Sequence, residues 1–257
     1  MIVLTHSYFM ALRLLRQLLR QPWWIALTLA QPVIWLVFYG QLFKGVANLP
    51  GFQSKSYITF LTPGIVTMSA LFSSGWSGMG ILRDLDFGVM DRFLVSPVSR
   101  VAIIAGRLLH LAFTTVVQSS ILITLGFVLG ARYPGGIGGI AVLIGCAVLV
   151  GVSFGALSNA LALTMRKMES VIGAVNFILL PMTFLSSILM ANTLMPPWIR
   201  KVSLVNPVNW AVEAGRTAIS ESPDWTAVLI RVACITTFAL VCGWVATRAF
   251  RSYQRSA

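Results

Sequence analysis

Apolar residues are gathered into six long runs, separated by short stretches that hold most of the polar and charged positions. Each run has the length of about 20 residues that a helix needs to cross the hydrocarbon core of a bilayer. A membrane β-barrel would show short alternating segments instead. The pattern therefore predicts an all-α polytopic membrane protein with six transmembrane helices, at about 23–43, 57–82, 101–130, 138–164, 170–192 and 226–248.

The composition supports this prediction. Of 257 residues, 57% are apolar and only 10% are charged, and the mean hydropathy is +0.85. Soluble domains carry roughly 25% charged residues, so most of this surface is expected to face lipid. No small-x-small cleavage site follows the first run, which is therefore expected to remain as a span rather than act as a signal peptide. Cys146, Cys234 and Cys242 all lie within predicted spans, so no structural disulfide is expected.

The net charge of +12 indicates topology and not nucleic-acid binding. With the N-terminus in the cytoplasm, twelve basic residues lie inside and six outside, and Arg231 lies within the last span near its outer end. The inner set is Arg13, Arg16, Arg20, Arg83, Arg92, Arg100, Arg107, Arg166, Lys167, Arg248, Arg251 and Arg255, and the outer set is Lys44, Lys55, Arg132, Arg200, Lys201 and Arg216. The positive-inside rule then predicts that both termini are cytoplasmic.

An amphipathic segment, residues 5–21, precedes the first span. Arg13, Arg16 and Arg20 lie on one face of the helix that it predicts, and leucines cover much of the rest. Such a helix lies in the membrane interface with its arginines toward anionic headgroups. Two roles remain open: the helix only orients the protein, or it also contacts a cytoplasmic partner.

Residues 193–222 are too apolar for a plain outer loop and too broken for a span. Pro196–Pro197 is typical of the start of one short helix, and Asn206–Pro207 of the N-cap and first residue of a second, which is expected to run to about Ile219. Glu213 and Arg216 are three residues apart and can pair on its face. The segment predicts a re-entrant helical hairpin that enters the membrane from the outside.

The sequence RDLDFGVMDRFLVSPVSR, residues 83–100, falls on the cytoplasmic side in this topology. It predicts a helix over 84–97, capped by Asp84 or Asp86 and stopped by Pro97. Large apolar side chains share one face of that helix. A helix with several aspartates is repelled by anionic lipid, so a protein partner with a groove for these side chains is favoured over the membrane surface.

Sequence motifs for nucleotide, metal and catalytic sites are missing. There is no GxxxxGK[ST] phosphate loop, and GFQSKS at 51–56 lacks the second glycine. There is no HExxH motif, and His6 and His110 stand far apart. The chain is therefore expected to be a non-enzyme that binds no cofactor or metal of its own. No predicted span has an acidic residue near its centre, which disfavours an ion-coupled secondary carrier.

The segment RDLDFGVMDRFLVSPVSR resembles the cytoplasmic helix of ABC-2-type exporter permeases, and NPVNWAVEAGR, residues 206–216, is similar to the signature before the last span of that family. The six-span layout and the interfacial helix agree with the resemblance, and the daunorubicin/doxorubicin-resistance type is the subgroup it most resembles. One departure is that aspartates stand at 84, 86 and 91, where glutamates are commoner in the family.

The resemblance implies a permease subunit of the bacterial cytoplasmic membrane that lacks its own ATPase. Two copies would pair as a homodimer in the lipid, and two separate ATP-binding subunits would carry ATP and Mg. The implied site residues fall into three sets. The ATPase-coupling set is Asp84, Asp86, Phe87, Met90, Asp91, Arg92 and Phe93; the substrate-path set is Phe60, Met68, Phe72, Asn176, Phe177 and Phe184; the outer-gate set is Trp198, Asn206, Pro207, Trp210, Glu213 and Arg216.

The expected function is ATP-driven export of an amphiphilic or hydrophobic compound, such as a drug, an antibiotic or a lipid. Apart from Asn176, the path residues are phenylalanines and a methionine, and none is charged, which suits such a cargo, although ordinary helix packing explains them equally well. Export of a polysaccharide or lipid-linked polymer is the alternative within transport, and an ion-coupled secondary carrier is the alternative outside ATP-driven transport.

Overall fold

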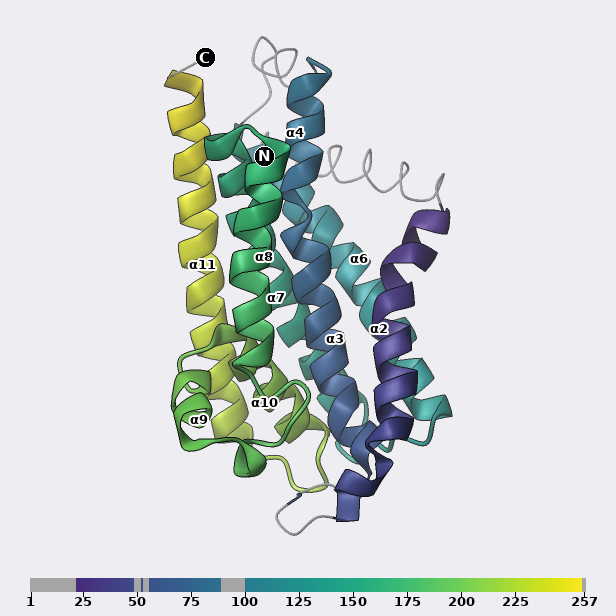
Figure 1. Cartoon of the computed structure of the whole chain (residues 1–257). Helices are drawn as coiled ribbons and strands as arrows, with labels where there is room; N and C mark the ends of the chain where they lie inside the picture. The colour runs from purple at the N-terminus through teal and green to yellow at the C-terminus, as the bar shows by residue number, and fades with distance from the viewer. Residues whose placement is uncertain (1–21, 49–51, 53–55, 89–99, 256–257) are drawn as a thin grey trace.

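The computed structural model describes residues 22–48, 52, 56–88 and 100–255, which form helices and no strand (Figure 1). The all-helical prediction is confirmed for this part of the chain. The predicted interfacial helix at 5–21 and residues 89–99 lie outside the described residues. The elements are α2 (Pro22–Leu42), η1 (Lys44–Asn48), α3 (Tyr57–Gly75), α4 (Gly78–Asp86), α6 (Arg100–Val128), α7 (Gly136–Met165), α8 (Met168–Phe184), η2 (Asn192–Leu194), α9 (Pro197–Ser203), α10 (Pro207–Ile219) and α11 (Trp225–Arg255).

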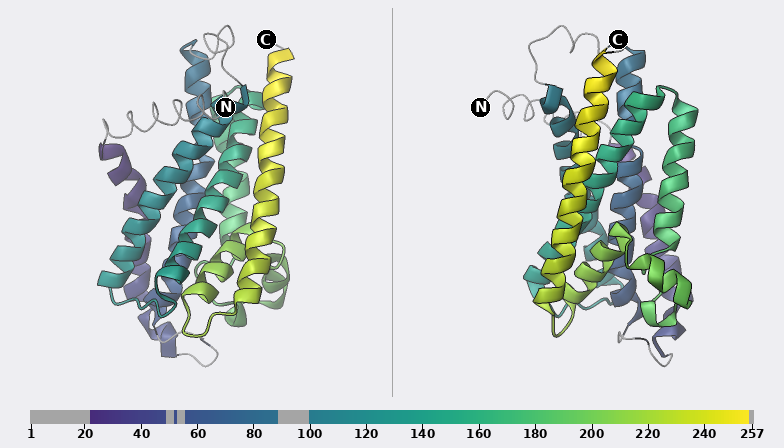
Figure 2. Two further views of the ribbon diagram at one scale, coloured as in Figure 1. Left: turned by 180° about the vertical axis from the view of Figure 1, so that it is seen from behind. Right: turned by 90° about the vertical axis from the view of Figure 1, so that its left-hand side faces the viewer.

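The long helices lie side by side in one bundle, as Figures 1 and 2 show. α4 and the last turns of α11 lie at one end of the bundle, and α9 and α10 lie at the other. Within the described residues, four helical stretches are long and apolar enough to cross a membrane, namely Tyr57–Asp86, Ile104–Val128, Gly136–Met165 and Trp225–Phe250. Ala26–Leu42 and Met168–Phe184 are apolar but shorter. The chain is therefore a polytopic helical membrane protein.

The centre of the bundle is α7, which packs against α3, α6, α10 and α11. Its glycines allow this close approach. A Cβ atom at Gly151 would lie 3.1 Å from Oγ1 of Thr115, and one at Gly155 would overlap the side chain of Leu111, both on α6. Small residues at this spacing let helices approach closely in membranes. Gly151 and Gly155 form a GxxxG pair, and this pair serves packing inside the chain.

The fifth predicted span, 170–192, extends too far. Its helix, α8, ends at Phe184, and residues 185–191 form an irregular segment. The physical reason is that other groups satisfy the backbone there. The side-chain amide of Asn206 donates to the carbonyl oxygens of Met182 and Leu185, at 2.8 and 2.9 Å. Non-helical backbone is tolerated in a membrane protein where protein groups bind it in this way.

The helix predicted over 57–82 is interrupted between α3 and α4. Ser158 of α7 fills the interruption: its hydroxyl donates to the carbonyl oxygen of Gly75 and accepts from the backbone N–H of Gly78. Gly78 is required here, because a Cβ atom at this position would overlap the backbone of Ser158. The interruption therefore leaves α4 as a separate segment, attached to α7 at its first residue.

Candidate functional site

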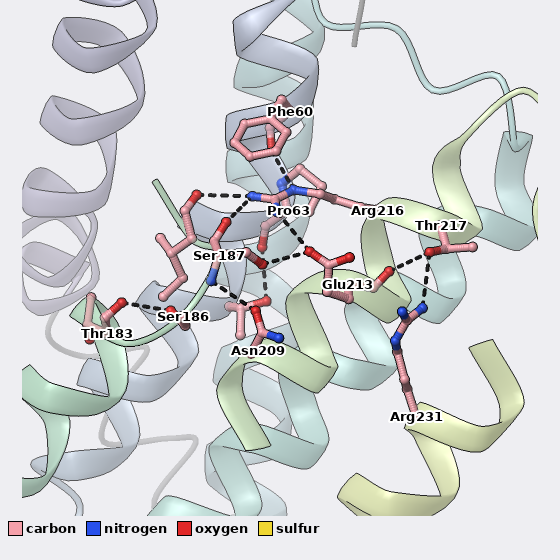
Figure 3. A network of polar contacts seen from close by, with 12 residues as sticks. Phe60, Pro63, Thr183, Ser186, Ser187, Asn209, Glu213, Arg216, Thr217 and Arg231 are labelled. Atoms are coloured by element: carbon pink, nitrogen blue, oxygen red, sulfur yellow. Dashed lines mark hydrogen bonds and ion pairs between the residues drawn. The ribbon is translucent and has the colours of Figure 1, made fainter. Parts of the chain in front are cut away.

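Arg216 joins three parts of the chain at the end of the bundle that holds α10 (Figure 3). Its guanidinium donates to the carbonyl oxygen of Phe60 on α3 at 3.1 Å, and to the carbonyl oxygens of Ser187 and Ile188 in the irregular segment. It also lies over the ring of Phe60, 3.6 Å from the ring centroid, as a cation–π pair. A single cation from α10 therefore binds both α3 and residues 187–188.

Glu213 supplies the counter-charge one turn earlier on α10. Its carboxylate is 3.2 Å from Nη1 of Arg216, which confirms the pairing predicted from their spacing. The same oxygen accepts from Oγ of Ser187 at 2.7 Å. Because an arginine side chain stays protonated in proteins, the contact of Arg216 with Glu213 is an ion pair.

Asn209 completes this polar network by accepting from the backbone N–H of Ser187 at 2.9 Å. Figure 3 shows the side chains of Asn209, Glu213 and Arg216 directed from α10 toward the irregular segment. A close backbone approach supports the arrangement, because a Cβ atom at Gly64 of α3 would overlap the carbonyl oxygen of Ile188. The irregular segment is thus held between α3 and α10.

The start of α10 agrees with the sequence prediction. Pro207 is its first residue and Asn206 is the N-cap, whose side chain accepts from the N–H of Val208 at 2.9 Å. Trp210 donates from its indole nitrogen to the carbonyl oxygen of Leu204, at 2.6 Å. Trp198 on α9 is exposed and lies outside the network. Five of the six predicted outer-gate residues therefore hold α10 in place or join it to its neighbours.

Arg231 extends the network to α11. Its guanidinium donates to Oγ1 of Thr217 at 3.4 Å, and Thr217 in turn donates to the carbonyl oxygen of Glu213 (Figure 3). The network contains two arginines, of which Arg216 is paired with Glu213, together with the hydroxyls of Ser187 and Thr217 and the amide of Asn209. Within the described part of the chain, no three His, Cys, Asp or Glu residues are grouped so as to hold a metal ion. The network can fix the positions of α3, α10, α11 and residues 185–191.

The opposite end of the bundle carries the described part of the predicted coupling set. Asp84 and Asp86 lie in the last turn of α4, so the prediction that they cap the start of a new helix is wrong. The helix ends there because Gly88 takes a left-handed conformation, with φ of 64°, which is typical of a helix C-terminus. Asp84 forms an ion pair with Arg107 of α6. Phe87 is 78% exposed, and Met90, Asp91, Arg92 and Phe93 lie outside the described residues.

The predicted path residues are divided between two environments. Phe60 and Met68 are buried and Phe72 is partly buried, in the interior of the chain. On α8, Asn176 is partly buried, whereas Phe177 and Phe184 are 81% and 65% exposed. The structure therefore does not bring the six residues together within one chain, and Phe60 packs with Arg216 instead.

Sequence reasoning missed Ser187 and Asn209 as members of the Arg216 network, and Ser158 as the residue that binds Gly75 and Gly78. It also missed Arg107 as the partner of Asp84, although a basic residue close to the start of a span was visible in the sequence. For the serines no local pattern gave a signal, because their partners are distant in the sequence.

Comparison with known proteins shows the family to which the sequence of this chain is similar. Residues 6–219 match the ABC-2 type transporter family. A putative transport permease, ycf38, of Pyropia yezoensis is 29% identical over 83% of this chain and 73% of its own length. The daunorubicin resistance ABC transporter permease protein DrrB1 of Streptomyces coeruleorubidus is 29% identical over 72% of this chain and 64% of its own length. The inner membrane transport permease YadH of Escherichia coli K12 is 25% identical over 84% of this chain and 85% of its own length.

The matched residues include the pairs Asp84–Arg107 and Glu213–Arg216, as well as both sequence segments that suggested the resemblance. It covers most of the chain. The protein therefore belongs to the ABC-2 type transporter family, as a transport permease.

Proposed function

We propose that this chain is the transmembrane subunit of an ATP-driven exporter of amphiphilic or hydrophobic compounds in a bacterial cytoplasmic membrane. Two copies form the path. Two separate ATP-binding subunits bind ATP and Mg, and their ATP hydrolysis drives transport. The observation that carries the proposal is the family match over residues 6–219, in a sequence without a phosphate loop. A transport permease of this kind needs an ATP-binding partner.

The proposed topology has six spans and both termini in the cytoplasm. α2 and α8 complete the six, since they run beside the four longer helices (Figure 2). Trp225 and Trp244 of α11 are 19 residues apart, which gives about 28 Å along a helix, close to the bilayer core of about 30 Å. Arg248 lies 4.2 Å over the ring of Trp244, and such Trp–Arg groups are typical of a membrane boundary.

The proposed outer gate is the segment from 185 to 219, with α9 and α10 as a re-entrant hairpin. Its irregular backbone is bound by Asn206, Asn209 and Arg216, which supports a place within the membrane, where unpaired backbone groups are costly. The contacts of Arg216 with Phe60 link this gate to α3.

The proposed path lies between two copies of the chain. On α8, Gly173, Phe177, Leu180 and Phe184 are exposed and lie on one face, at the spacing of a helix-packing seam. Such a face can meet a second permease or an apolar cargo. The drug-resistance permeases among the relatives favour a hydrophobic compound over a polymer as the cargo.

The proposed docking site for the ATP-binding subunits begins at the end of α4. Phe87 is a large apolar side chain, 78% exposed, beside the exposed carboxylate of Asp86. An apolar helix face that enters a groove of a partner is a common recognition mode. Met90, Asp91, Arg92 and Phe93 continue this surface in the sequence-based hypothesis.

The test is uptake into inverted membrane vesicles that contain the permease with its ATP-binding subunit. Doxorubicin and a fluorescent phospholipid are the two probes. Uptake of either probe should require ATP hydrolysis and should persist when the proton gradient is collapsed. Uptake that needs no ATP and stops with the proton gradient would identify a secondary carrier and contradict the proposal.

A further inference from the structure

Asp84 and Arg107 tie together the two helices that flank residues 89–99. α4 ends at Asp86 and α6 begins at Arg100, so both helices lead directly to that part of the chain. The carboxylate of Asp84 pairs with Nη2 of Arg107, whose Cα lies about two turns inside α6. The helices on either side of residues 89–99, α4 and α6, are therefore joined by an ion pair.

Arg107 also contacts the backbone of α4. Its Nη2 donates to the carbonyl oxygen of Gly80 at 3.2 Å. A Cβ atom at Gly80 would lie only 2.8 Å from Nη1 of Arg107, so glycine leaves the room that the guanidinium occupies. The side chains of Arg107 and Asp84 are 10% and 23% exposed. The pair is thus a partly desolvated, two-point attachment of α4 to α6.

The attachment matters because the regular α-helix ends at Gly75 and resumes only at Gly78. The helix is interrupted at Trp76 and Ser77, where Ser158 binds Gly75 and Gly78. The two segments are joined only by a turn, in which Ser77 and Gly80 donate to the carbonyl oxygens of Ser74 and Ser77. Besides this turn, contacts of α4 lead to α7 and, through Arg107, to α6.

We propose that Arg107 is a positioning residue for transport: it binds α4 to α6, so that the two helices move as one unit when the ATP-binding subunit acts on the cytoplasmic end. This inference rests on the proposed function. Its physical basis is that breaking a partly buried ion pair leaves an uncompensated charge, which keeps the two helices together during small displacements. The movement then reaches α6 as well as α7.

The first experiment measures doxorubicin uptake per ATP hydrolysed by the complex in inverted vesicles. Arg107→Gln is expected to lower this ratio about tenfold while ATP hydrolysis continues, a size typical of coupling between sites. The double variant Asp84→Arg, Arg107→Asp is expected to recover most of the ratio. Lys167→Gln, which removes an exposed charge at the turn between α7 and α8, is the matched control. A native ratio in Arg107→Gln would overturn the inference.

The second experiment replaces the ion pair by a covalent link. Asp84→Cys and Arg107→Cys are combined in a background where Cys146, Cys234 and Cys242 are replaced by alanine. The ratio is expected to be low without a link, to return with a short reducible bis-methanethiosulfonate cross-linker, and to fall again on reduction. A link that stops transport would show that α4 and α6 must separate, which contradicts the inference.

A third measurement does not depend on transport. Hydrogen–deuterium exchange of the isolated permease reports local opening of Gly78–Asp86. Arg107→Gln is expected to raise exchange in this helix about tenfold, and Lys167→Gln to leave it unchanged. Unchanged exchange in Arg107→Gln would overturn the inference even if neither probe is transported. Lack of ATP-driven transport by the native complex, with raised exchange in Arg107→Gln, would contradict the proposed function alone.

Discussion

Replacement of Arg216 by methionine is expected to destabilise the permease strongly. Methionine keeps most of the side-chain length but loses the bonds to the carbonyl oxygens of Phe60, Ser187 and Ile188. It also leaves the carboxylate of Glu213, 22% exposed, without its counter-charge. Removal of one partner from a buried pair costs about 3–5 kcal/mol.

This cost converts into a measurable change of melting temperature. For a chain of this size, 1 kcal/mol corresponds to roughly 2–4 °C, so the Tm of Arg216→Met is expected to fall by on the order of 10 °C. The assay is a thermal melt of the detergent-solubilised permease, followed by size-exclusion chromatography. Arg200→Met, an exposed arginine on α9, is the matched control and should melt within about 2 °C of the native protein.

A second variant separates the ion pair from the rest of the network. Arg216→Met combined with Glu213→Gln removes the unpaired charge, and should recover about half of the lost stability, because glutamine still accepts from Ser187. A single variant that melts with the native protein would refute the account of Arg216. A double variant no more stable than the single one would show that the unpaired charge of Glu213 contributes nothing.

Variants at three further positions, Gly64, Asn206 and Ser158, test close packing and backbone hydrogen bonding in the same thermal melt. Gly64→Ala should lower the Tm by several degrees, because its Cβ atom would overlap the carbonyl oxygen of Ile188, whereas Gly145→Ala, with open space around it, should not; equal effects would contradict the close approach. Asn206→Ala should cost about 1–3 kcal/mol. Asn206→Asp should cost at least as much, because its buried carboxylate keeps the cap on Val208 but faces the carbonyl oxygens of Met182 and Leu185 without a donor. Ser158→Ala should cost about 1–3 kcal/mol by leaving groups of Gly75 and Gly78 unpaired, and a native Tm would show that the interruption needs no partner.

The hydrophobic pattern alone predicted the helical fold and the approximate place of the long helices, because apolar runs of that length are directly visible in a sequence. The proline, N-cap and i, i+3 patterns also predicted the start of α10 and the pairing of Glu213 with Arg216. These are local features, and a local signal is sufficient for them.

Two errors have a common physical cause. α8 ends at Phe184, ahead of the predicted end of its span, because Asn206 and Arg216 satisfy the backbone that follows. Asp84 and Asp86 belong to α4, because Ser158 allows the chain to continue as a helix past Gly75. In each case a side chain distant in the sequence determines where a helix ends or continues, and no periodicity reveals it.

The coupling of this permease to a separate ATPase is tested most directly by purification of the chain from solubilised membranes. The native chain should bring down an ATP-binding subunit that contains a phosphate loop, and Phe93→Asp should lose it. Trp198→Asp replaces an exposed aromatic residue on α9, at the end of the bundle away from α4, and should retain the subunit. If no ATP-binding subunit accompanies the native chain, the account of an ATP-driven exporter is contradicted.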